Sequence, residues 1–188
     1  MENALIVSHT EKSTAFFTEM LNAASVKQVA ALQSCGEARR AVLERDFDLV
    51  VVNAPLMDES GESFCRHIAS KFVSQVILVV KSEYYDAVSA ACEDYGVLTI
   101  SKPVNRAVFW SVLALSKSTR NKILRIQDEN ARLKRKIEDI RIVDRAKCML
   151  ISFLDMSEQE AHRYIEKQAM DMRCAKREIA EGILKTYE

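Results

Sequence analysis

The chain has 188 residues, 48% of them hydrophobic, and its 27 Lys and Arg residues balance 27 Asp and Glu residues. This length and apolar fraction are enough for one ordinary domain and a smaller second one, and they exclude a disordered chain. No secretory signal is recognisable at the N-terminus, and no apolar run approaches the roughly 18 residues of a membrane span. We therefore expect a cytoplasmic protein that does not engage a membrane.

Two further features of the composition narrow the classes of function. The five cysteines stand singly, without CxxC spacing, and there are three histidines. Reduced thiols are therefore expected, with neither a disulfide framework nor a metal site, and no cofactor is expected. Residues 1–117 hold 11 Lys and Arg against 14 Asp and Glu, whereas residues 118–188 hold 16 against 13. The basic surplus of the second part permits a polyanionic partner there.

Short apolar runs alternate with amphipathic segments through the first 116 residues. Strands are predicted at 4–7, 26–32, 48–53, 75–80 and 97–101, and helices at 10–23, 36–44, 62–71, 84–95 and 103–116. Runs of consecutive apolar residues are typical of strands that are buried on both faces. The alternation predicts an α/β domain over residues 1–117 with a flavodoxin-like, five-stranded, doubly wound parallel sheet.

Sheets of this kind bind ligands at the carboxyl ends of their strands. The positions to inspect there are Ser8, His9, Asn53, Val80 and Lys102. Gly61 lies eight residues after Asn53, and Pro103 follows Lys102 directly after the fifth predicted strand. With these residues and the order of strands and helices, residues 3–116 resemble the receiver domain of response regulators.

The resemblance implies an aspartate at the end of the third strand that accepts a phosphoryl group, and an acidic pair after the first strand that holds Mg²⁺. Asn53 stands at the aspartate position, and an amide has no anionic form that can act as a nucleophile. Ser8 and His9 replace the acidic pair, and Val80 replaces the usual hydroxyl residue unless the register is shifted by one residue. We therefore expect a pseudo-receiver without phosphotransfer chemistry, in which Lys102 hydrogen-bonds to Asn53 or to a carbonyl group.

Apolar residues recur at alternating spacings of three and four after Lys117. The stripe consists of Ile123, Ile126, Leu133, Ile137 and Ile140, with Asn130 between them. This heptad pattern predicts a coiled-coil dimerisation helix over residues 118–140. A buried asparagine at an a position favours a parallel coiled coil of two helices. No Gly or Pro interrupts the helix before Leu154, so it would be on the order of 57 Å long and would join two domains.

Beyond residue 140 the pattern predicts a three-helix bundle over residues 141–188. The long helix continues through Val143, Ala146, Leu150 and Phe153 or Leu154, which we expect in the bundle core. Ser157 and Glu160 have the spacing of a capping box and predict the start of a second helix. A break near Arg173 and Cys174 separates it from a last helix.

Four short segments of this region carry a second resemblance. They are Arg145–Leu150, Met156–Ala161, Ala169–Asp171 and Arg177–Ala180. In this order they resemble an ANTAR domain, an RNA-binding antitermination module, over about residues 137–186. The resemblance implies RNA-binding roles for Ala146 and Lys147, although Cys148 stands where the family commonly has Gly.

The residue types of the bundle agree with an RNA partner. Cations that can meet phosphates or bases of an unpaired loop are Arg141, Arg145, Lys147, Arg173, Lys176 and Arg177. Small alanines allow close approach, and for Ala146, Ala161, Ala169 and Ala180 helix packing is preferred over RNA contact. For Lys147 the order is reversed, because RNA affinity depends strongly on such cations.

These observations favour a non-enzymatic antitermination regulator. A dimer would present two bundles to paired hairpin loops of a leader transcript and so prevent the terminator from forming. A regulatory protein partner or dimerisation would control the receiver-like half. Two alternatives stay open: a response-regulator-like module that acts by protein docking, and a DNA-binding transcription factor, for which no recognition-helix pair with a Gly turn stands out.

Overall fold

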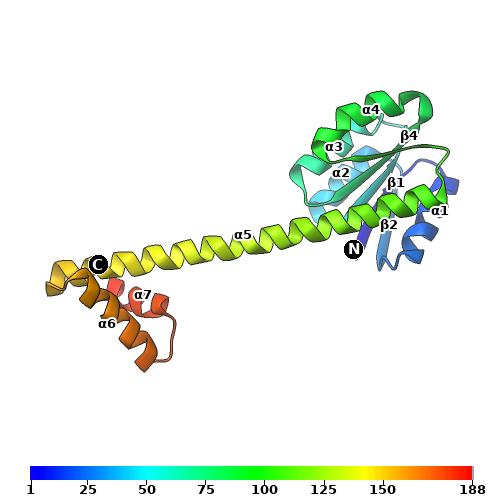
Figure 1. Cartoon of the computed structure of the whole chain (residues 1–188). Coiled ribbons are helices and arrows are strands. Elements are labelled where there is room, and N and C mark those ends of the chain that lie inside the picture. Colours follow the sequence, from blue (N-terminus) through cyan, green and yellow to red (C-terminus); the bar gives the residue numbers. More distant parts are fainter. Residues whose placement is uncertain (188) are drawn as a thin grey trace. The chain divides into compact units, whose positions relative to one another are not determined.

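A computed structural model describes residues 1–187, which belong to two compact units, Met1–Leu124 and Arg125–Glu188 (Figure 1). Glu188, which ends the predicted bundle domain, lies outside the described residues. Within the described part of the chain, no helix is long and apolar enough to cross a membrane.

The first unit is built on a five-stranded parallel sheet. Its strands are β1 (Asn3–Val7), β2 (Gln28–Leu32), β3 (Leu49–Asn53), β4 (Gln75–Lys81) and β5 (Leu98–Lys102). They pair in the order β2-β1-β3-β4-β5. This sheet confirms the predicted flavodoxin-like α/β fold.

Helices cover both faces of the sheet (Figure 1). They are α1 (Glu11–Ala23), α2 (Cys35–Glu44), α3 (Glu62–Lys71), α4 (Tyr85–Cys92) and α5 (Arg106–Leu154), with short 3-10 turns η1 (Ser82–Tyr84) and η2 (Glu93–Tyr95). Because successive strand residues point to opposite faces, the apolar runs supply two cores. Val51 of β3 packs with Phe17 of α1 and Phe109 of α5, whereas Val52 packs with Phe64 of α3 on the other face.

Gly61 precedes α3 in the left-handed conformation, with φ of 84°. A Cβ atom there would lie 2.9 Å from Cγ1 of Val52, so the turn requires glycine. Glycine is therefore required at position 61 by the backbone conformation of this turn.

Helix α5 runs without interruption for 49 residues. The helix predicted at 103–116 and the helix predicted from residue 118 to Leu154 are one continuous helix, because neither Gly nor Pro lies between them. Its first part belongs to the first unit, where Phe109 and Leu113 are buried and Arg120 pairs with Asp48.

The second unit is a three-helix bundle formed by the end of α5, α6 (Glu158–Asp171) and α7 (Lys176–Tyr187). Its core consists of Ile142, Ala146, Leu150, Ala161, Ile165, Ala180, Ile183 and Leu184. Ser157 and Glu160 form the predicted capping box at the start of α6. The expectation that Phe153 or Leu154 would join the core is wrong: both are exposed, and the core includes Ile142, about three turns earlier on α5.

Candidate functional site

The receiver-like site lies at the carboxyl ends of β1, β3 and β5. Ser8 and Asn53 are both buried, and Nδ2 of Asn53 donates a hydrogen bond of 3.0 Å to Oγ of Ser8. Nζ of Lys102 donates to the carbonyl oxygen of Ala54 at 2.6 Å, so of the two expected acceptors it uses a carbonyl group. Burial and the nearby ammonium of Lys81 lower the pKa of Lys102.

The other two positions predicted to lie at the carboxyl ends of the strands, His9 and Val80, add few polar groups to this site. His9 is exposed, and Val80 is buried next to Ser101 of β5. The hydroxyl of Ser101 lies 2.9 Å from that of Ser82. Among residues 1–187, no three His, Cys, Asp or Glu side chains are grouped so that they could hold a metal ion.

In the bundle, three of the predicted RNA-binding cations line one groove of about 340 Å³. The groove is bounded by α5, α6 and the start of α7, and its lining includes Lys147, Lys176 and Arg177. Ile140 and Val143 supply an apolar wall. Residues that are far apart in the sequence thus form one concave surface that includes three cations.

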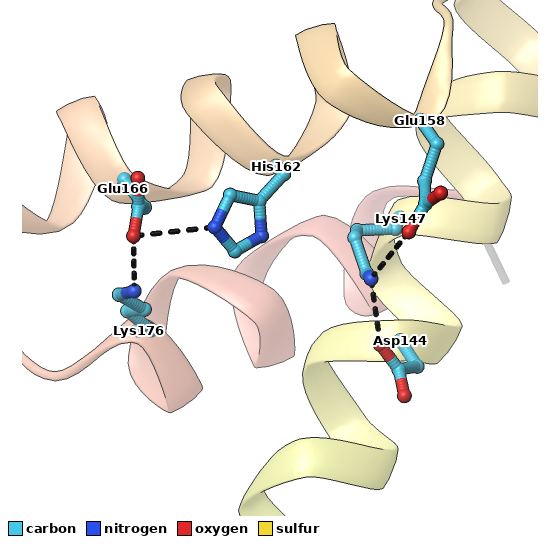
Figure 2. Close-up of polar contacts among 6 residues, drawn as sticks. All are labelled: Asp144, Lys147, Glu158, His162, Glu166 and Lys176. Atoms are coloured by element: carbon cyan, nitrogen blue, oxygen red, sulfur yellow. Dashed lines mark hydrogen bonds and ion pairs between the residues drawn. The ribbon is translucent and has the colours of Figure 1, made fainter.

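Lys147 is held by acids of two helices (Figure 2). Its Nζ lies 2.8 Å from Oδ1 of Asp144 and 3.3 Å from Oε1 of Glu158, and only 15% of its side chain is exposed. The hydrogen bond to Asp144 raises the pKa of Lys147, so its positive charge is retained. This lysine joins α5 to the start of α6.

The other two cations of the groove are also paired. Figure 2 shows Glu166 between Lys176 and His162; Nε2 of His162 lies 3.3 Å from the carboxylate. The hydrogen bond from Lys176 lowers the pKa of Glu166. Arg177 reaches Asp139 at 2.8 Å and Glu181 at 2.7 Å. Their side chains are more accessible than Lys147, with 48% exposed for Lys176 and 40% for Arg177.

The remaining predicted RNA-binding residues do not join this groove. Arg145 precedes Lys147 by two residues, and such residues of a helix point about 200° apart. Arg141 lies 4.0 Å from Glu138 on α5 and is exposed. Arg173, with φ of 51°, lies in the turn between α6 and α7. Ala146 is fully buried, which assigns its side chain to helix packing.

Sequence reasoning missed the groove acids and His162, because ion-pair partners are set by packing. The predicted RNA-binding residues also did not include four exposed cations of α5, Arg132, Lys134, Arg135 and Lys136. Their close spacing was a signal that could have found them.

The heptad stripe is exposed along α5 in the single chain. Exposed fractions are 50% for Ile126, 46% for Leu133, 51% for Ile137 and 60% for Ile140. Ile123 is partly exposed, and Asn130 is exposed. Exposed apolar rows on one face of a helix are typical of helices that pair with another helix.

Known proteins resemble each of the two units. Residues 131–184 match the family model of the ANTAR domain. Over 139 residues the chain is 27% identical to the transcriptional regulatory protein PdtaR of Mycobacterium tuberculosis, and the match covers 74% of this chain and 68% of the relative.

Solved receiver domains have a similar fold. The signal receiver domain of an HD domain-containing protein from Pseudomonas fluorescens gives a TM-score of 0.59 at 16% identity, covering 66% of this chain and 92% of that chain. A CheY-like receiver domain from Methylobacillus flagellatus gives 0.52 at 24% identity, covering 62% and 98%. These likenesses concern the fold alone.

Proposed function

The chain carries an ANTAR domain over residues 131–184 behind a domain of receiver fold, and from this premise we propose that it is a transcriptional regulator that binds RNA. Its targets are hairpin loops of leader transcripts, and binding stabilises an RNA fold that prevents the terminator from forming. The protein acts without catalysis, in the cytoplasm.

The groove of the bundle is the observation that carries this proposal. It places accessible cations of α7 beside an apolar wall from α5, and an unpaired RNA loop offers phosphates and flat bases for such a surface. Lys176 and Arg177 are its main phosphate ligands, because their side chains are about half exposed. Arg173, Arg141 and Arg145 extend the contact outside the groove.

Ion pairs within the bundle shape this surface before RNA arrives. Carboxylates of Asp139, Glu166 and Glu181 hold the cations of α7 in place. Phosphates must replace or join these carboxylates, so binding depends strongly on salt. Lys147 has a different role: its side chain is only 15% exposed and its ammonium holds α6 against α5, so it contributes to RNA affinity mainly by keeping the groove in shape.

Titration with hairpin RNA and with duplex DNA tests the proposal. The double variant Lys176→Gln, Arg177→Gln should weaken binding to the hairpin and reduce the salt slope by about 0.7 to 0.9 units for each phosphate that the protein no longer neutralises. Lys185→Gln is the matched control, since Lys185 is an exposed cation of α7 that does not line the groove. Lys147→Gln should lower affinity with an unchanged slope.

Four outcomes would contradict parts of this proposal. Unchanged hairpin affinity in the folded double variant would place the RNA surface elsewhere. Preference for duplex DNA would favour a DNA-binding factor, and no nucleic-acid binding at all would favour a protein-docking module. A smaller salt slope in Lys147→Gln would restore Lys147 as a direct phosphate ligand.

The exposed stripe of α5 supports a homodimer. Pairing of two stripes would bury Ile126, Leu133 and Ile137 in a parallel coiled coil, with Asn130 opposite its symmetry mate, and would end before Ile140, which lines the groove. The bundle core uses another face of the same helix, at Ala146 and Leu150. A dimer can therefore present both grooves to two hairpin loops.

The first domain acts as a pseudo-receiver in this proposal, with input from a regulatory protein partner. We expect no phosphorylation on incubation with acetyl phosphate and Mg²⁺, because the amide of Asn53 is not a nucleophile and donates to Ser8. Intact-mass measurement checks this. A stoichiometric phosphoryl adduct would overturn the pseudo-receiver assignment.

A further inference from the structure

A cavity of about 360 Å³ lies at the carboxyl end of the sheet, beside Asn53. It is formed by the first turns of α1, the end of β3, and the end of β5 with the segment that follows. Its lining residues are Lys12, Ser13, Phe16, Phe17, Asn53, Lys102, Pro103 and Val104. None of the functions proposed above uses this cavity.

The charges of this cavity are positive. Lys12 and Lys102 both line it, and none of the residues described as lining it carries a carboxylate. Glu11, the acid next to Lys12 in the sequence, lines a different cavity with Ser8 and Thr14. Two lysines thus line one space, and no lining carboxylate neutralises them.

Lys102 can serve an additional acceptor. An ammonium has three N–H donors, and one of them reaches the carbonyl oxygen of Ala54. Burial without a carboxylate partner disfavours its charge, which agrees with its lowered pKa. An anion in the cavity would supply the missing negative charge.

Neutral donors and an apolar wall complete the site. The hydroxyl of Ser13 accepts a hydrogen bond of 2.8 Å from that of Thr10, which leaves its own hydrogen to donate. The amino end of α1, where Lys12 and Ser13 lie, adds a positive potential. Phe16, one turn after Lys12 on α1, and Pro103 and Val104 after β5 offer apolar surface.

We propose that this cavity binds a small organic anion without covalent chemistry, with its carboxylate or phosphate between Lys12 and Lys102 and its apolar part against Phe16 and Val104. An acidic cluster that holds a metal ion would repel such a ligand, whereas Ser8, His9 and Asn53 do not. Binding gives the first domain a chemical input that is independent of phosphoryl transfer. It is also independent of the RNA proposal.

Calorimetric titration of the full chain with benzoate tests the site, with inorganic phosphate as the anion without an apolar part and benzyl alcohol as the uncharged ligand. Ligands of this size bind with dissociation constants of about 0.1–10 mM. Benzoate should bind more tightly than phosphate, benzyl alcohol should not bind, and added salt should weaken the binding of both anions.

The double variant Lys12→Gln, Lys102→Gln should weaken benzoate binding roughly tenfold or more, since glutamine cannot replace either charge-assisted hydrogen bond. Lys27→Gln is the matched control, because Lys27 is an exposed lysine paired with Glu2 at the other end of the sheet. Thermal melting verifies that each variant is folded.

Equal binding by the folded double variant would overturn the proposal, as would equal binding of benzyl alcohol or no binding of benzoate in this concentration range. Binding of phosphate alone would overturn the assignment to an organic anion. Hairpin titrations report on the RNA proposal separately, because they use the other unit of the chain.

Discussion

Replacing Ile137 by Asp is expected to convert the proposed dimer into monomers at micromolar concentration. Ile137 is an exposed a position towards the C-terminal end of the stripe, and pairing would bury it against its symmetry mate. A buried charge without a partner costs about 3–5 kcal/mol, and a dimer contains two of them. Sedimentation velocity measures the change directly.

Arg135→Asp is the matched control for this experiment. Arg135 lies two residues earlier at an f position, which points away from the stripe, so its replacement should leave the dimer intact. As the converse, Asn130→Ile should raise the melting temperature and permit higher oligomers. A wild-type chain that sediments as a monomer, or an Ile137→Asp variant that stays dimeric, would contradict the coiled coil.

Leu150→Ala is expected to unfold the bundle while leaving the first unit folded. Leu150 is 1% exposed at the centre of the bundle core, and removing a buried leucine side chain typically costs about 2–5 kcal/mol. A unit as small as Arg125–Glu188 has only about 3–5 kcal/mol of stability to lose. Hairpin binding should disappear with the bundle.

Thermal melting followed by far-UV circular dichroism checks this result in the full chain. Leu154→Ala is the matched control: Leu154 lies one turn later on the same helix and is 46% exposed, so its replacement should cost about 0.5 kcal/mol or less. Similar melting of the two variants would mean that the bundle core is not centred on Leu150.

Local patterns were sufficient to predict most of the fold. Apolar runs such as Leu49–Val52 alternate with amphipathic helices, and burial on both faces of a parallel sheet leaves that signature in any sequence. The capping box at Ser157 was equally readable, because its two partners are three residues apart. The heptad stripe was predicted from spacing, and the structure places it on an exposed face of α5.

The sequence alone thus determined the element order, the receiver-like sheet and the absence of an aspartate at position 53. Tertiary structure decided which cations are accessible. Lys147 meets Glu158 across the turn between α5 and α6, and Arg177 meets Asp139 from another helix. It also decided that Lys12 and Lys102 share a cavity. The physical reason is that periodicity records which side of an element is buried, whereas ion pairs and cavities depend on where separate elements meet.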